Sequence, residues 1–170
     1  MEKQVILLNG PSSSGKSTLA KMLQTLILTD RGEQYEIISI DDFLKMTAQD
    51  VIYEEDVFEI SQLLCDAAKN AAQTKDGVII DHVITSKRIF DQLTDALRGF
   101  RLRTVCVTCP PEVLQEREAA RKDRCPGSAE ASAAFLFPKS GYDLTVDTHS
   151  RTAAECADRI FACCFQCGEQ

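Results

Sequence analysis

Short apolar runs alternate along the chain with longer segments in which apolar residues recur every three or four positions. The short runs are typical of buried strands, and the longer segments are typical of amphipathic helices. Because strands and helices alternate to the end of the sequence, the pattern predicts an α/β fold, a five-stranded parallel sheet flanked by helices. The expected strands cover residues 4–8, 35–40, 78–80, 102–108 and 144–147.

The periodic segments differ in length and regularity. The first, at residues 19–27, places its apolar side chains on one helical face directly after a strand. A helix that opens with two prolines is expected from residue 110 to 124, and residues 128–141 are the least regular part of the chain. Further helices are expected at 43–46, from 56 to about 71, at 89–97 and at 152–167.

Length and charge narrow the classes of function. At 170 residues the chain suits one domain, residues 1–170, with a sizeable core. Its net charge of −7 gives no electrostatic footprint for nucleic acid. No apolar segment approaches the ~20 residues of a membrane span, and the apolar run at the N-terminus is too short for a signal peptide. We expect a cytoplasmic protein with no nucleic-acid or membrane partner, and the sequence leaves a homo-oligomer open.

Residues 10–18 read Gly-Pro-Ser-Ser-Ser-Gly-Lys-Ser-Thr and match G-x-x-x-x-G-K-[ST] between the first strand and the first helix. Gly10 and Gly15 let the backbone turn tightly and approach a phosphate chain closely. The loop amides and the helix N-terminus then direct hydrogen-bond donors and a positive dipole at the anion. The motif predicts a nucleoside triphosphate site. The residues expected to bind the nucleotide there are Gly10, Ser12, Ser13, Ser14, Gly15, Lys16, Ser17 and Thr18.

Three residues, two in this motif and one at a later strand end, suit charge neutralisation and metal binding. Lys16 supplies a compact cation for the β- and γ-phosphates and is a catalytic candidate, and the Ser17 hydroxyl is placed to bind Mg²⁺. Asp81 follows three aliphatic residues at the end of the expected third strand, where a carboxylate can contact Mg²⁺ through water. The alternative for Asp81 is an acid that is merely solvated at a strand end.

A phosphoryl transfer also needs a carboxylate that orients and deprotonates the attacking hydroxyl. Asp41, at the end of the expected second strand, is the candidate base. The adjacent Asp42 is the alternative, and either residue could instead cap the following helix. His82, beside Asp81, is a rival base or a polar residue at a strand end, and His149 has no assigned role.

Arg117, Arg121 and Arg124 are spaced at i, i+4 and i+7, which places them along one side of the helix that enters the irregular segment. A flap is expected at about residues 117–141, and guanidinium groups on a flap can neutralise a transferring phosphate. All three arginines are candidates for nucleotide binding, and Arg121 and Arg124 are also catalytic candidates. The alternative is a solvated helix face paired with nearby acids, Glu116, Glu118 and Asp123.

Eight cysteines include two C-x-x-C spacings, Cys106/Cys109 and Cys164/Cys167. Such spacings occur in zinc sites, but residues three apart in a strand point to opposite faces of the sheet. The second pair mixes with Ile160 on the apolar side of the last expected helix. Because free cysteine packs as a small hydrophobe, core packing is the prediction.

Several blocks of sequence resemble the chloramphenicol phosphotransferase-like P-loop kinases, over nearly the whole chain. The blocks are residues 6–10, 38–41, 117–124 with Gly127, 142–148 and 155–157. The resemblance implies a nucleotide- and shikimate-kinase-like fold and an ATP-dependent, Mg²⁺-requiring kinase for a small-molecule hydroxyl. It also implies a catalytic base at Asp41 and nucleotide-side arginines at Arg121 and Arg124. It does not identify the acceptor.

The residues and the resemblance together lead us to expect a small-molecule O-phosphotransferase that uses ATP and Mg²⁺. Two alternatives stay open. The first is a kinase for a nucleoside, a sugar nucleotide or another metabolite. The second is a non-catalytic ATP-binding module, in which the carboxylate of Asp41 would have no chemical role.

Overall fold

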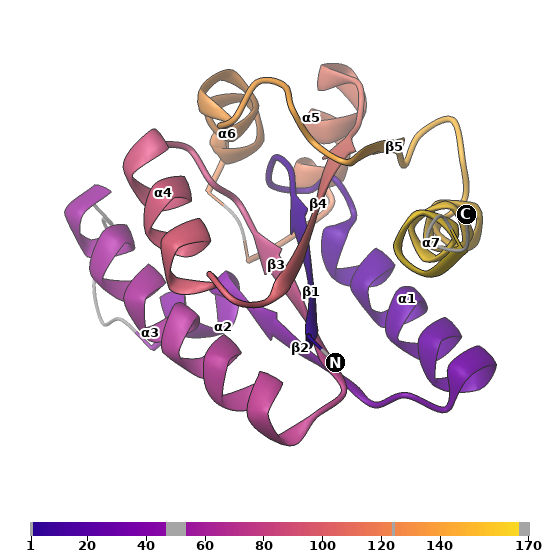
Figure 1. Ribbon diagram of the computed structural model, residues 1–170. Helices are drawn as coiled ribbons and strands as arrows, with labels where there is room; N and C mark the ends of the chain where they lie inside the picture. Colours follow the sequence, from indigo (N-terminus) through magenta and orange to yellow (C-terminus); the bar gives the residue numbers. More distant parts are fainter. Residues whose placement is uncertain (1, 47–53, 124, 167–170) are drawn as a thin grey trace.

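The computed structural model describes residues 2–46, 54–123 and 125–166 and contains a single sheet of five parallel strands (Figure 1). The strand order is β2–β3–β1–β4–β5, so β1 is central and β3 lies between it and the edge strand β2. The predicted five-stranded parallel sheet is confirmed. The strands are β1 (Gln4–Asn9), β2 (Tyr35–Ser39), β3 (Gly77–His82), β4 (Arg101–Thr108) and β5 (Leu144–Asp147).

Helices cover both faces of this sheet. In Figure 1, α3 and α4 lie on one side, α1 and α7 lie on the other, and α5 and α6 lie above the carboxyl ends of the strands. No helix in the described parts of the chain is long and apolar enough to cross a bilayer. The helices are α1 (Lys16–Arg31), α2 (Ile40–Leu44), α3 (Glu54–Thr74), α4 (Lys87–Ala96), α5 (Pro111–Ala119), α6 (Ser128–Phe135) and α7 (Ala153–Phe161), followed by a π-helical turn (Ala162–Gln166).

The core forms two layers, one on each face of the sheet. Both β1 and β3 are buried along their whole length. Because successive side chains of a strand point to opposite faces, Val5 and Leu7 pack in the layer under α3 and α4, whereas Ile6 and Leu8 pack in the layer under α1 and α7. The central strands are therefore fixed from both sides, and their carboxyl ends form a rigid edge.

The loop between β1 and α1 requires glycine at two points. A Cβ on Gly10 would lie 2.3 Å from the carbonyl oxygen of Val107, so the loop leaves the sheet against the backbone of β4. Gly15 has φ +90°, a backbone conformation that residues with a side chain rarely adopt, and it caps the N-terminus of α1. These two positions direct the loop across the edge of the sheet and into the helix.

Two helices differ from the sequence prediction. α5 ends at Ala119 rather than near residue 124, because its last turn tightens and the Arg121 N–H bonds to the Glu118 carbonyl three residues back. Arg117 and Arg121 therefore do not lie along one helix, and Arg124 lies outside the described residues. α6 occupies part of the segment expected to be irregular; its Ala-rich sequence favours a helix, a signal that the prediction overlooked.

Candidate active site

The P-loop cavity, of about 320 Å³, lies over the glycine loop at the carboxyl edge of the sheet. Asp41 reaches it from α2, Asp81 from β3, and Arg121 from the turn after α5. The loop contributes six of the predicted nucleotide-binding residues to its wall, namely Ser12, Ser13, Gly15, Lys16, Ser17 and Thr18.

The Lys16 side chain and the Ser12 and Ser13 side chains of the loop are buried. The Lys16 ammonium donates to the carbonyl of Pro11 at 2.8 Å, across the loop, and the side chain is buried. The Ser12 and Ser13 hydroxyls are also buried, and they have no hydrogen-bond partner among the described residues. Since buried polar groups are normally satisfied by protein, water or ligand atoms, these hydroxyls are available to a polar ligand at the loop.

Ser17 and Asp81 meet at one end of the P-loop cavity. The Ser17 hydroxyl donates to the Asp81 carboxylate at 2.7 Å, and Asp81 is buried. A hydroxyl and a carboxylate are the hard oxygen donors that Mg²⁺ prefers, and Mg²⁺ sites commonly use one or two carboxylates with water and phosphate. The donor set therefore fits the predicted magnesium site.

The two candidate bases lie on different sides of α2. β2 ends at Ser39, so Asp41 and Asp42 lie in the first turn of the helix rather than at a strand end. Asp41 lines the P-loop cavity and a second cavity beside it, whereas Asp42 lines a separate cavity between β2 and α3. The geometry thus brings Asp41, and not Asp42, to the loop.

The second cavity, called the α3–α6 cavity, has a volume of about 510 Å³ and opens beside the glycine loop. It shares Ser12, Ile40, Asp41 and Val83 with the P-loop cavity, so the two cavities adjoin at these residues. Its lining is apolar and neutral except for two acids. The lining residues are Ser12, Ile40, Asp41, Leu44, Glu54, Val57, Val83, Thr85, Ile89, Ser128, Ala131, Ser132 and Phe135.

A third cavity, the α5–α7 cavity of about 460 Å³, adjoins the other side of the loop. Arg117 on α5 donates to the Thr148 hydroxyl at 3.1 Å and to the Thr148 carbonyl at 3.0 Å. The same hydroxyl donates to the Ser14 carbonyl at 2.6 Å, which ties the end of β5 to the glycine loop. Arg121 lines this cavity and the P-loop cavity, and its guanidinium pairs with Asp123.

No histidine or cysteine among the described residues lines any of these three cavities. His82 is fully buried, which lowers its pKa to about 4, and it lines none of the three cavities. His149 lies in the turn after β5. No cluster of three or more His, Cys, Asp or Glu side chains that could hold a metal occurs in 2–46, 54–123 and 125–166.

Core packing is confirmed for half of the cysteines. Cys109 and Cys163 are partly exposed and Cys125 is exposed, while Cys167 lies beyond the described residues. The buried members occupy both layers of the core or the sheet between them, and they are Cys65, Cys106, Cys156 and Cys164.

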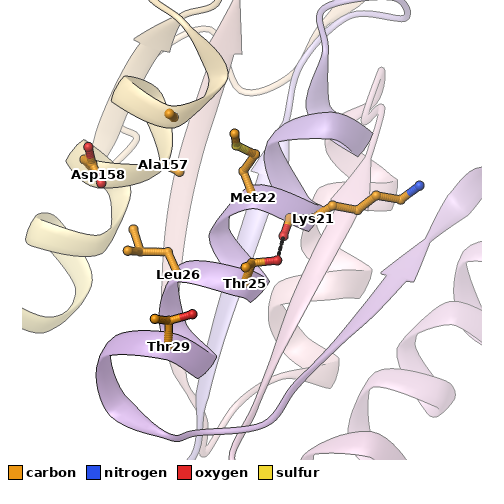
Figure 2. Close-up of a pocket in the computed structure, with 8 residues that line it drawn as sticks. Lys21, Met22, Thr25, Leu26, Thr29, Ala157 and Asp158 are labelled. Atoms are coloured by element: carbon orange, nitrogen blue, oxygen red, sulfur yellow. Dashed lines mark hydrogen bonds between the residues drawn. The ribbon is translucent and has the colours of Figure 1, made fainter.

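A fourth cavity of about 460 Å³, the α1–α7 groove, lies away from the loop (Figure 2). Met22 and Leu26 of α1 face Ala157 of α7 across it, and the Lys21 side chain extends away from them. Met22, expected on the buried face of the helix, is 41% exposed here. The groove shares no lining residue with the three joined cavities, so it is not part of the candidate active site.

Sequence reasoning did not assign three residues that shape the site. Thr148 links Arg117 to the loop, and it belongs to a block that carries the family resemblance, which was its only signal. Ser132 contacts the Ser12 amide, and Glu118 contacts the start of α6. Neither contact could be found without first recognising α6 as a helix.

Comparisons with solved structures show the same fold in several kinases. The APS kinase CysC of Mycobacterium tuberculosis, solved in complex with AMPPNP and APS, is 16% identical, with 96% of this chain and 98% of that chain aligned at a TM-score of 0.78. A gluconokinase from Sinorhizobium meliloti is 21% identical (98% and 94% aligned, TM-score 0.71). A shikimate kinase from Acinetobacter baumannii, in complex with shikimate, is 16% identical (99% and 96% aligned, TM-score 0.67).

Sequence comparison adds a family to this fold. No curated protein matches the chain significantly in sequence. The model of the family described as chloramphenicol phosphotransferase-like protein, in contrast, matches residues 3–164. This match covers almost the entire chain, including the glycine loop, both sides of the candidate site and the last helix. The chain therefore belongs to the chloramphenicol phosphotransferase-like family and has the fold of P-loop kinases.

Proposed function

We propose that the protein is a kinase that transfers the γ-phosphate of Mg-ATP to a hydroxyl group of a small molecule. One observation carries the proposal: the P-loop cavity shares lining residues with a cavity on each side, and Asp41 is among those shared with the α3–α6 cavity. A donor and an acceptor can thus meet at the loop from opposite sides. Family membership and the kinase fold support the same activity.

The α5–α7 cavity is the proposed site of the nucleoside part of ATP. It opens onto the loop beside Gly15 and Thr18, so a nucleotide that extends from it places its phosphates in the P-loop cavity. Arg117 stands at its wall in a position fixed by two bonds to Thr148. The loop amides and Lys16 then bind the phosphates, as a helix N-terminus and a nearby ammonium favour.

Ser17 and Asp81 are the proposed holders of Mg²⁺. The ion would neutralise negative charge on the β- and γ-phosphates. Lys16 and Arg121 lie on the same cavity and add positive charge where the phosphoryl group moves. Arg124 belongs to the proposal on sequence grounds only, since it lies outside the described residues.

Asp41 is the proposed general base. The acceptor enters through the α3–α6 cavity and presents its hydroxyl at the junction with the P-loop cavity. The hydroxyl oxygen forms a bond to the γ-phosphorus, the bond from that phosphorus to the β–γ bridging oxygen breaks, and ADP leaves. The hydroxyl proton passes to the Asp41 carboxylate.

The α3–α6 cavity indicates the charge of the acceptor. Its described lining contains Asp41 and Glu54 but no lysine, arginine or histidine. An acceptor with a carboxylate, sulfate or phosphate would lose its hydration there without a cation to replace it. We therefore propose an uncharged acceptor with an apolar body, which disfavours a sugar nucleotide.

The first test measures ADP release from Mg-ATP for the wild type, Asp41→Asn and Asp42→Asn. Loss of a general base typically costs about 10²- to 10⁴-fold in rate, so Asp41→Asn is expected to lose acceptor-dependent turnover while it still binds ATP. Asp42→Asn is the matched control, since the same change on the other side of α2 leaves turnover near the wild-type rate. Absence of acceptor-stimulated turnover in all three proteins would favour the non-catalytic binding module, whereas equal stimulated turnover in all three would exclude Asp41 as the base.

The acceptor panel compares chloramphenicol and uridine, which are uncharged, with gluconate and shikimate, which are carboxylates. Acceptor-stimulated ADP release is expected only with uncharged members. Stimulation by a carboxylate and not by the uncharged compounds would overturn the proposed acceptor class, and it would leave the kinase activity itself established.

A further inference from the structure

Helix α6 forms one wall of the α3–α6 cavity, and it is bonded directly to the glycine loop. The Ser132 hydroxyl accepts a hydrogen bond from the Ser12 amide at 2.9 Å and donates to the carbonyl of Ala129 at 3.0 Å. Both serines line the cavity and both are buried. The position of this wall is therefore set by a contact with the same loop that receives the phosphates.

The first turn of α6 is held by a carboxylate from α5. Gly127, with φ +88°, precedes the helix and has no side chain to cap it. The Glu118 carboxylate accepts from the Gly127 amide at 2.9 Å and, through its other oxygen, from the Ala129 amide at 2.7 Å. Glu118 is 8% exposed, so both bonds form away from water, where a carboxylate at a helix N-terminus is most stabilising.

α5 also reaches the opposite side of the site. Arg117, the residue before Glu118, is bonded to Thr148, and Thr148 is bonded to the Ser14 carbonyl of the loop. Consecutive residues of one helix therefore contact the α5–α7 cavity and the wall of the α3–α6 cavity. Any ligand that fixes α5 through Arg117 also fixes Glu118, because both belong to the same helical turn.

We infer that Glu118 and Ser132 are positioning residues that couple nucleotide binding to the formation of the acceptor cavity. The inference rests on the proposed function, since it needs a nucleotide in the α5–α7 cavity. Nucleotide binding steadies α5, Glu118 transmits that restraint to the start of α6, and Ser132 fixes the middle of α6 to the loop. The acceptor then meets a wall that the nucleotide has already ordered.

The test uses Mg²⁺ with the analogue AMPPNP as the probe, so it does not depend on knowing the acceptor. Amide hydrogen exchange is measured over residues 127–135 with and without the probe, and calorimetry measures its affinity. In the wild type, the probe is expected to slow exchange of the α6 amides by at least about tenfold, the sign of a local opening that has been suppressed.

Glu118→Gln is expected to lose most of this response while AMPPNP affinity stays within about threefold. The amide has one acceptor oxygen where the carboxylate has two, so one of the two α6 bonds is lost. Glu130→Gln is the matched control, because it makes the same chemical change at an exposed position of α6. Its response should equal that of the wild type.

Ser132→Ala provides a milder variant, and Ser132→Thr restores the hydroxyl. The alanine variant should lose probe-dependent protection of α6 and of the Ser12 amide, and the threonine variant should regain it. A merely structural role would shift exchange equally with and without the probe. A wild type that binds AMPPNP without any change in α6 overturns the coupling alone, whereas a wild type that does not bind Mg-AMPPNP overturns the proposed function and this inference with it.

Discussion

At the scale of single residues, the end of β3 holds two adjacent buried polar side chains that differ in their contacts. Asp81 points toward α1 and bonds to Ser17, while the next residue, His82, is fully buried. Burial is the main cause that lowers the pKa of His82 to about 4, with the nearby charge of Lys16 as a smaller cause. An imidazole in this state is neutral at physiological pH.

The buried imidazole makes stability depend on pH. Between about pH 6.5 and 4 the unfolded chain binds a proton at His82 that the folded chain does not, so the free energy of unfolding falls as pH falls, by up to about 3 kcal/mol at pH 4. Urea unfolding measured from pH 7.5 to 4 checks this. His82→Gln should flatten the curve relative to the wild type, and His149→Gln should not. Identical slopes in the wild type and His82→Gln would show that His82 does not contribute.

The sequence located the polar side chains at this edge of the sheet but not their burial. The glycine motif and the carboxylates Asp41 and Asp81 could be found because their residue types and spacing carry the signal. The choice between Asp41 and Asp42 could not, because it depends on which side of a five-residue helix faces the loop. The environment of His82 depends on side chains from distant segments, which no local pattern records.

At the scale of elements, the helices differ in how their first turns are satisfied. α6 receives its cap from another helix, whereas α7 begins with a local capping box. In that box the Glu155 amide donates to the Thr152 hydroxyl, and the Glu155 carboxylate accepts from the Thr152 amide. The start of α7 is accordingly visible in the sequence, whereas the cap of α6, Glu118, comes from α5 and leaves no local signal beside the Ala-rich composition.

The local cap of α7 leads to a prediction on stability. Thr152→Ala removes the hydroxyl acceptor and is expected to lower the free energy of unfolding by about 1 kcal/mol. Thr25→Ala is the matched control: that hydroxyl only bonds back to the Lys21 carbonyl within α1, so the better helix former should be neutral or stabilising by about 0.5 kcal/mol. Urea unfolding followed by circular dichroism measures both, because the chain has no tryptophan. Equal losses in the two variants would argue against the capping role.

At the scale of the whole molecule, the layered core sorts the cysteines by reactivity. Burial raises the pKa of Cys65 to about 11 and that of Cys164 to about 12, so both are protonated as well as shielded. Cys125 is exposed in the segment between α5 and α6. These differences follow from the two-layer packing, which the alternation of strands and helices predicted.

A thiol reagent should therefore report on folding. At pH 8 we expect Cys125 to react first among the described cysteines of the native protein, and Cys65 and Cys164 to react only at the rate of unfolding. Peptide mapping after brief labelling checks this order, and Cys125→Ser should leave the slow labelling of Cys65 and Cys164 unchanged. Early labelling of Cys65 would contradict the described core.

Asp41 lies where the P-loop cavity and the α3–α6 cavity adjoin. The other residues that line the cavities on the two sides of the loop come from different segments of the chain. Under the proposed function, the donor side is lined mainly by residues 12–18, 117–121 and 148–153, and the acceptor side mainly by 40–44, 54–57, 83–89 and 128–135. Because these stretches hardly overlap, exchanging the acceptor-side segments between family members can alter the compound that is modified without disturbing the delivery of phosphate. If the proposed function holds, a new acceptor would require changes only in these short acceptor-side segments, while the segments that deliver phosphate stay the same.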